Sequence, residues 1–156
     1  MADYRISSIT LDDEGVLRRT RAIEQEREVA IYDLLEANRF QLEGSPGGPY
    51  RLNLGVEENR LVFDISLEDD SHHGKVMLSL APFRSLIRDY FLICDSYYKA
   101  IRTAPPSQIE SLDMGRRALH DEGAGLLRTR LSGKIETDFD TARRLFTLIC
   151  VLHLKG

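Results

Sequence analysis

The stretch YRLNLGVEENRLVFDISL, residues 50–67, alternates apolar and polar side chains on either side of Glu58 and Asn59. Alternation with a period of two residues is typical of a β-strand that buries one face. A two-residue turn at Glu58 and Asn59 brings Val56 opposite Leu61, and every apolar side chain of the two strands then falls on the same face. The same register pairs Leu54 with Phe63, Leu52 with Ile65 and Tyr50 with Leu67. The stretch therefore predicts an antiparallel hairpin with a defined register.

Weaker strand patterns flank this hairpin on both sides. Val76, Leu78 and Leu80 continue the alternation and predict a third strand. The opening YRISSI, residues 4–9, and the pair Phe40 and Leu42 are further strand candidates. We expect these strands to form an antiparallel meander of about four strands.

Four segments repeat their apolar residues at helical spacing. They run from residue 23 to 38, from 82 to about 102, from 107 onward and from 140 to about 153. Ser107 and Glu110 form a capping-box pattern at the start of the third segment. Thr137 or Asp138 is the expected cap of the last. The fold class predicted is α+β, with four or so helices packed on the apolar face of the sheet.

Length and composition indicate a single domain over residues 1–156, with 42% hydrophobic and 29% charged residues. The 21 basic and 25 acidic residues give a net charge of -4, which repels nucleic-acid phosphates, so we do not expect nucleic-acid binding. The start of the chain is too polar for a signal peptide, and no apolar run reaches the roughly 18 residues of a membrane span. We therefore expect a cytoplasmic protein without a membrane segment.

Charged residues interrupt the apolar pattern of SLDMGRRALHDEGAG, residues 111–125. Arg116 falls on the same helical stripe as Leu112 and Leu119, the stripe expected to face the core. A guanidinium does not lose its proton on burial, so it requires an anionic partner or a water-filled cleft. Asp113 and Arg117, together with His120, share a neighbouring face.

Two interpretations of this helix stay open. In one, Arg116 or Arg117 binds a phosphate or carboxylate, and His120 supplies a proton or a hydrogen bond. In the other, Arg116 forms an internal salt bridge with an acid elsewhere in the chain, and Asp113 and Arg117 form a solvated pair. Either interpretation places negative charge close to Arg116.

Arg143 and Arg144 extend the set of candidate cations to the last helix. Asp140 stands four residues before Arg144 and is its expected partner. Arg143 lacks such a carboxylate in the sequence, and if it faces Arg116 the two form an anion clamp. Tyr97 is expected at the edge of the same cavity.

Other motifs give weaker signals. EDDSHHG, residues 68–74, combines acids and two histidines, but adjacent histidines diverge in an extended backbone, so we expect a solvated loop and no metal site. Gly123 and Gly125 indicate either a kink or the close passage of another backbone. Cys94 and Cys150 lie in separate apolar runs and are expected to be buried, reduced thiols. The sequence identifies no cofactor.

Three long phrases resemble the bacterial UPF0262 family, which occurs largely in alphaproteobacteria. They are EREVAIYDLLEANRF, LAPFRSLIRDYFLICDSYYKAIRTAPPSQIESLDMGRRALHDEG and DFDTARRLFTLICVLH, and together they span much of the chain. The resemblance implies a single-domain protein of the bacterial cytoplasm. It implies no activity, substrate or cofactor.

The sequence is therefore compatible with three functions. The first is a non-enzymatic binding or regulatory module that recognises an anionic small molecule or an acidic partner segment through Arg116, Arg117 and Arg143, with His120 and Tyr97 at the margin. The second is a hydrolase-like acid-base enzyme in which His120 carries the proton and Asp113 or Glu122 orients it. The third is a structural homodimer. For the first, we expect Arg116→Ala to abolish ligand-dependent stabilisation and to leave the fold intact.

Overall fold

The computed structural model describes residues 3–12 and 21–153. Its main sheet has four strands in the order β1-β3-β4-β5. Their bounds are Ile6–Leu11 for β1, Tyr50–Glu57 for β3, Arg60–Leu67 for β4 and His72–Ser79 for β5. The predicted hairpin is confirmed, since β3 pairs with β4 in the register that places Val56 opposite Leu61. Glu58 and Asn59 have φ angles of 50° and 64°, and positive φ at both central residues is the geometry of a tight two-residue hairpin turn.

The expected α+β class and the mostly antiparallel four-stranded sheet are confirmed, but the sheet is mixed because one edge departs from the expected meander. β1 pairs with β3 in the parallel sense, with Ile9 opposite Leu52. The chain between these strands forms α1 (Arg21–Glu36) and the short strand β2 (Phe40–Leu42), which provide the crossover that parallel pairing requires. β2 does not join the main sheet and pairs instead with β6 (Ile135–Thr137) in a separate two-stranded ribbon.

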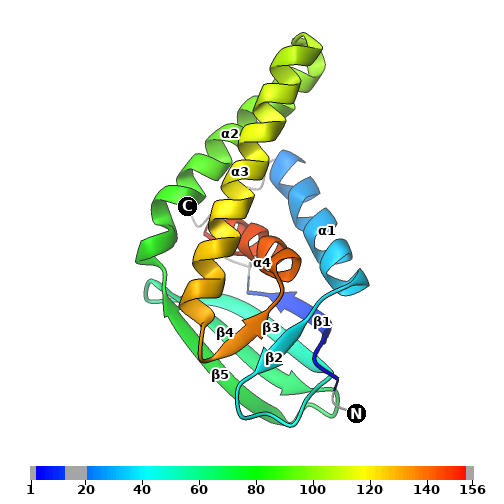
Figure 1. The fold of residues 1–156 in the computed structure, drawn as a ribbon, viewed down its shortest axis with the longest axis vertical. Helices are drawn as coiled ribbons and strands as arrows, with labels where there is room; N and C mark the ends of the chain where they lie inside the picture. The colour runs from blue at the N-terminus through cyan, green and yellow to red at the C-terminus, as the bar shows by residue number, and fades with distance from the viewer. Residues whose placement is uncertain (1–2, 13–20, 154–156) are drawn as a thin grey trace.

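The helices lie on one side of the main sheet (Figure 1). After a short 3₁₀ turn, η1 (Ala81–Phe83), come α2 (Arg84–Thr103), α3 (Pro106–Leu131) and α4 (Phe139–Leu152). α4 lies innermost, between the sheet and the other helices (Figure 1), and its residues from Leu145 to Leu152 are all buried. α2 and α3 form a long antiparallel pair whose far end projects beyond the rest of the molecule (Figure 1).

The structure confirms one of the two predicted helix caps and contradicts the other. Asp138 is the N-cap of α4, and its side chain accepts a hydrogen bond from the backbone N–H of Thr141. The capping box predicted at Ser107 is wrong. α3 begins at Pro106, and its N-cap residue, Pro105, makes no side-chain capping bond. A proline suits the first helical position because its φ is already helical and its missing N–H is one that the helix leaves unpaired.

Gly123 sets the contact between α3 and α4. A Cβ added there would stand 2.5 Å from ring atoms of Phe146, so only a glycine lets the ring approach this closely. The neighbour that passes close is thus a side chain of α4 and not a backbone. Cys94 and Cys150 are buried free thiols, as expected. Among residues 3–12 and 21–153, no helix combines the length and apolar character needed to cross a bilayer.

Candidate functional site

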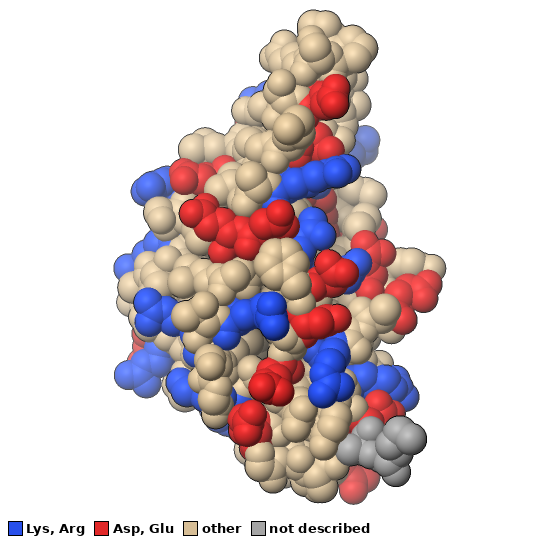
Figure 2. All heavy atoms as spheres, viewed as in Figure 1, with Lys and Arg blue, Asp and Glu red and all other residues tan. Residues whose placement is uncertain are grey.

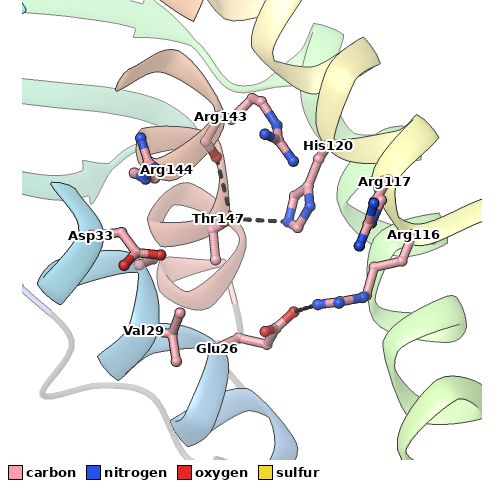
Figure 3. A pocket seen from close by; sticks show the side chains of 10 residues that line it. Glu26, Val29, Asp33, Arg116, Arg117, His120, Arg143, Arg144 and Thr147 are labelled. Carbon is pink, nitrogen blue, oxygen red and sulfur yellow. Dashed lines mark hydrogen bonds and ion pairs between the residues drawn. The ribbon is translucent and has the colours of Figure 1, made fainter. Parts of the chain in front are cut away.

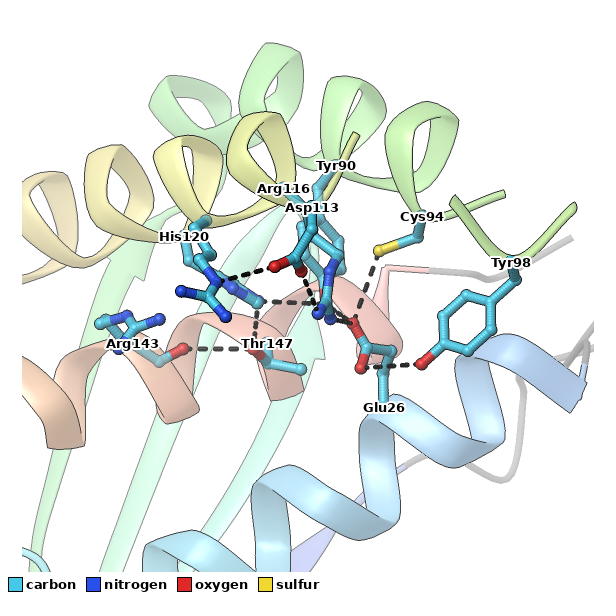
Figure 4. Close-up of polar contacts among 10 residues, drawn as sticks. Glu26, Tyr90, Cys94, Tyr98, Asp113, Arg116, His120, Arg143 and Thr147 are labelled. Atoms are coloured by element: carbon cyan, nitrogen blue, oxygen red, sulfur yellow. Dashed lines mark hydrogen bonds and ion pairs between the residues drawn. The ribbon is translucent and has the colours of Figure 1, made fainter. Parts of the chain in front are cut away.

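A buried ion pair joins α1 to α3. Glu26 is only 7% exposed and lies on the buried stripe of α1 with Ile23, Ala30 and Leu34. Its Oε1 accepts a hydrogen bond of 2.9 Å from Nη1 of Arg116 (Figure 4). The internal salt bridge of Arg116, one of the two interpretations left open by the sequence, is therefore present. Its partner comes from a helix 90 positions earlier in the chain.

Three groups of α2 also converge on Glu26 (Figure 4). The hydroxyl of Tyr90 donates to Oε1 at 2.7 Å, that of Tyr98 donates to Oε2 at 3.3 Å, and Sγ of Cys94 lies 3.6 Å from Oε1. Burial, reinforced by the charge of Glu26, raises the pKa of the Tyr98 hydroxyl to about 12. Burial likewise raises the pKa of the Cys94 thiol to about 12, so this thiol stays protonated at neutral pH and is a poor nucleophile.

Arg116 is bound on several sides. Its Nη2 donates to Oδ1 of Asp113 at 2.8 Å, and its guanidinium carbon lies 4.6 Å from the centre of the Tyr97 ring, a cation–π distance. Burial disfavours the charged guanidinium, but the hydrogen bond to Asp113 and the charge of Glu26 outweigh that effect and raise the pKa of Arg116. The hydrogen bond from Arg116 lowers the pKa of Asp113 in turn. Arg116 is thus a fixed positive charge.

His120 lies one helical turn beyond Arg116 on α3. Its Nε2 is 3.1 Å from the Tyr90 hydroxyl oxygen and 3.1 Å from Oγ1 of Thr147 on α4. Burial lowers the pKa of His120 to about 4, and the charges of Arg116 and Arg143 act in the same direction. The imidazole is therefore neutral at pH 7.

A cavity of about 340 Å³ opens between α1, α3 and α4 beside this network (Figure 3). We call it the arginine cavity because four arginines line it. Its lining residues are Glu26, Val29, Ala30, Asp33, Arg116, Arg117, His120, Arg143, Arg144 and Thr147. Four guanidinium groups therefore face two carboxylates, and the formal charge of the lining is positive.

The arginines of this cavity differ in how firmly they are bound. Nε of Arg117 lies 3.0 Å from Oδ2 of Asp113, and its side chain is 69% exposed. Arg143 is held loosely, with Nε 3.3 Å from Asp121 and Nη1 3.7 Å from Asp140.

Nε of Arg143 is itself buried and forms no well-directed hydrogen bond. Within the described part of the chain, Arg144 has no carboxylate within 4.0 Å, so the predicted pair between Asp140 and Arg144 is not formed. Asp140 lies closer to Arg143, three residues along the helix. Arg143 and Arg144 thus retain hydrogen-bonding capacity.

The structure brings together four of the residues singled out in the sequence. Arg116, Arg117, His120 and Arg143 all line the arginine cavity, as Figure 3 shows. The others named in the sequence lie apart from it. Asp113 bonds to two arginines and not to His120, Glu122 is exposed, and Tyr97 lines a second cavity that also borders Arg116.

Sequence reasoning missed Glu26, Tyr90 and Thr147, and it assigned Arg144 to a pair with Asp140 and not to the cavity. Glu26 carried a signal, because an acid between Ile23 and Ala30 on an apolar stripe requires a partner just as Arg116 does. Tyr90 and Thr147 carried none, since a tyrosine or threonine on a buried helix face is ordinary.

The segment EDDSHHG, residues 68–74, takes no part in the arginine cavity. Nε2 of His72 contacts Asp64 at 3.1 Å, whereas Nε2 of His73 contacts Oγ of Ser45 at 2.7 Å, so the adjacent rings have different partners. Within the described residues, no cluster of three or more histidine, cysteine, aspartate or glutamate side chains is arranged to hold a metal ion.

Comparisons with known proteins give a family. The profile of the uncharacterised protein family UPF0262 matches residues 3–155. A UPF0262 protein of Phenylobacterium zucineum is 58% identical over 153 residues, which cover 98% of this chain and 95% of that protein. One from Caulobacter vibrioides is 58% identical over 155 residues, with coverage of 99% and 96%. One from Rhizobium etli is 54% identical over 154 residues, with coverage of 99% and 98%. No solved structure matches the chain. The chain belongs to the UPF0262 family.

Proposed function

We propose that this protein is a binding module for a small anion, which it holds in the arginine cavity. The observation that carries this function is the convergence of four arginines from two helices on one concavity. Guanidinium groups bind carboxylates and phosphates through paired, charge-assisted hydrogen bonds. Arg143 and Arg144 are the principal ligands, because neither is held by a short ion pair to another side chain.

The size of the cavity favours a small molecule over an acidic protein segment. A volume of about 340 Å³ is at the lower end of the range of ordinary ligand pockets, roughly 300 to 1,000 Å³. Such a volume accommodates a phosphorylated or carboxylated metabolite. An acidic helix or loop of a partner protein requires a longer groove.

A thermal-shift screen with inorganic phosphate, small carboxylates and phosphorylated metabolites tests this function. We expect at least one of these anions to raise the melting temperature of the native protein in a concentration-dependent manner. Arg143→Ala and Arg144→Ala should each weaken that binding at least tenfold, because each removes a charge-assisted contact. Arg128→Ala, on an exposed position of α3 outside the cavity, is the matched control. Unchanged affinity in both cavity variants, or no binding of any anion at millimolar concentration, contradicts the function.

Arg116→Ala is not a suitable test of binding, contrary to the expectation from sequence. Arg116 neutralises Glu26, which is 7% exposed, and removing one partner of a buried ion pair leaves an uncompensated charge in the protein interior. We therefore expect Arg116→Ala to destabilise the fold as well as the site.

An acid-base enzyme is the second candidate, and the hydrogen-bonded series from Glu26 through Tyr90 to His120 favours it. A pKa of about 4 counts against it, because at pH 7 only about one imidazole in a thousand carries the proton that a general acid must donate. Turnover of phosphate esters or carboxylic esters that is lost in His120→Gln establishes the enzyme. Turnover that is equal in the native protein and the variant excludes His120 as its catalyst.

A further inference from the structure

The hydrogen bonds around His120 have only one consistent direction. Oε1 of Glu26 is a carboxylate oxygen and only accepts, so the single hydroxyl proton of Tyr90 lies in the 2.7 Å bond to Glu26. The Tyr90 oxygen therefore has no proton left for His120. At 3.1 Å from Nε2 it can only accept.

Because the Tyr90 oxygen can only accept, Nε2 of His120 must carry a hydrogen. The contacts of Thr147 agree with this assignment. Its oxygen lies 3.1 Å from Nε2 and can accept that hydrogen, and its own hydroxyl hydrogen can then go to the backbone carbonyl oxygen of Arg143 at 3.2 Å.

The other ring nitrogen is consequently a hydrogen-bond acceptor. A neutral imidazole carries its hydrogen on one nitrogen and a lone pair on the other, so Nε2–H leaves the lone pair on Nδ1. Among the described residues, Nδ1 has no hydrogen-bond partner. Figure 3 shows this nitrogen on the side of the ring away from Thr147, and His120 lines the arginine cavity.

Because His120 lines the cavity and its Nδ1 has no partner among the described residues, we take the cavity to offer two kinds of polar group to a ligand. Guanidinium groups are donors only, and they suit the anionic oxygens of a ligand. Nδ1 of His120 is an acceptor only, and it suits an O–H group. An anion without an O–H group places a lone pair of one of its oxygens against the lone pair of Nδ1 or leaves this nitrogen without a ligand partner.

We propose that the arginine cavity selects oxyanions that carry a hydroxyl hydrogen, and rejects isosteric anions that carry none. This selectivity rests on the anion-binding function proposed above. It requires that the bound anion carry an O–H group on or beside its anionic centre. Hydrogen phosphate has that chemistry within a single group. A 2-hydroxycarboxylate has it on neighbouring carbons.

Phosphate and sulfate form the sharpest pair of probes. At pH 8 both are tetrahedral dianions of similar size, but hydrogen phosphate has one O–H group and sulfate has none. Titration calorimetry of the native protein with the sodium salts should give a dissociation constant at least tenfold lower for phosphate. Lactate and propionate form a second pair, which differs in the same hydroxyl group and separates a hydroxycarboxylate ligand from a phosphate ligand.

The outcomes separate the two proposals. Preference for the hydroxyl-bearing member of either pair supports the selectivity and identifies its source. Equal binding of phosphate and sulfate, with lactate and propionate also equal or absent, overturns the selectivity and leaves anion binding intact. No binding of any of the four, in either the native protein or the Arg128→Ala control, counts against both.

The side chains responsible are tested on the same pairs. His120→Gln should bring the ratio of the two dissociation constants close to one, because a glutamine amide presents either its oxygen or its NH₂ group to the ligand. Tyr90→Phe removes one of the two acceptors that hold the hydrogen on Nε2, and it should reduce the ratio by a smaller factor.

The tautomer is measured directly in the unmodified protein, so this selectivity does not depend on a variant that folds. A two-bond ¹⁵N–¹H spectrum of histidine-labelled protein at pH 8 should identify Nε2 of His120 as the protonated nitrogen. A hydrogen on Nδ1 overturns the inference.

Discussion

At the scale of single residues, Glu26 and Arg116 show how burial dictates partners. Each lies on a helical stripe that is otherwise apolar, and neither sequence neighbourhood offers it full compensation. A buried charge is stable only if it is paired and hydrogen-bonded. The sequence therefore predicted negative charge close to Arg116, from either an internal acid or a bound anion. It did not predict that the partner is Glu26, because only the packing of α1 against α2 and α3 brings the two together.

His120 makes stability depend on pH in a defined direction. Its pKa is about 4 in the folded protein and about 6.5 when unfolded, so between these values the unfolded state binds more protons. The free energy of unfolding should therefore fall as the pH falls from about 6.5 to about 4, by about 3 kcal/mol at most from this group. Urea denaturation at a series of pH values measures the fall.

The matched control for this pH effect is His120→Gln. Carboxylates and His153 also titrate in this range, and burial lowers the pKa of His153 too. The difference between the native and variant profiles isolates His120. Parallel profiles between pH 4 and 6.5 mean that the imidazole is not buried as a neutral group.

At the scale of elements, two glycines of α3 provide a matched pair of substitutions. Gly123→Ala places a methyl group 2.5 Å from the ring of Phe146, and we expect it to lower the free energy of unfolding by about 1 to 3 kcal/mol. Gly125→Ala meets nothing within 4 Å, and we expect it to raise the free energy of unfolding by up to about 1 kcal/mol through helix propensity. Chemical denaturation of both variants measures these opposite changes.

The opposite signs test the packing of α3 on α4 and not merely the loss of a glycine. If alanine stabilises the helix equally at both positions, α3 and α4 do not approach at Gly123. If it destabilises both, Gly125 is not an open helical position.

Elements differed in how well the sequence predicted them. The hairpin of β3 and β4 was predicted to the residue, because alternation and a two-residue turn together determine the register. β1 and β2 were recognised as strand candidates, but their partners were not. Parallel pairing of β1 and the ribbon of β2 with β6 depend on where α1 and α3 carry the chain, which short alternating segments do not encode.

At the scale of the whole molecule, charge of both signs is spread over the surface. Figure 2 shows lysine and arginine side chains interspersed with aspartate and glutamate on the face that it draws. The net charge of -4 agrees with this mixture. A broad positive surface for nucleic-acid phosphates is not present on that face.

The projecting end of the α2–α3 pair and the central helix α4 should differ strongly in local stability. Residues 101–111 are all exposed or half-buried, whereas Leu145 to Leu152 are all buried. Segments with few buried contacts open locally at low free energy, and core segments open only on global unfolding. Hydrogen exchange followed by mass spectrometry should therefore show the fastest helical exchange at residues 101–111 and the slowest in α4.

Strong protection of residues 101–111 contradicts that expectation for a monomer. If the protection increases with protein concentration, a second copy covers the projecting end, and the homodimer hypothesis gains support. Sedimentation at the same concentrations distinguishes a dimer from the 17.8 kDa chain.

The sequence by itself determined the α+β class, the central hairpin with its register, the approximate extent of the helices and the need for negative charge near Arg116. These features depend on the period of apolar residues and on the cost of burying an unpaired charge, and both are local properties of the chain. Only the tertiary structure decided the parallel edge of the sheet, the choice of Glu26 as partner, and the cavity that gathers Arg143 and Arg144 beside His120. These depend on contacts between residues far apart in the sequence, which the tertiary packing of the helices on one another and on the sheet brings together.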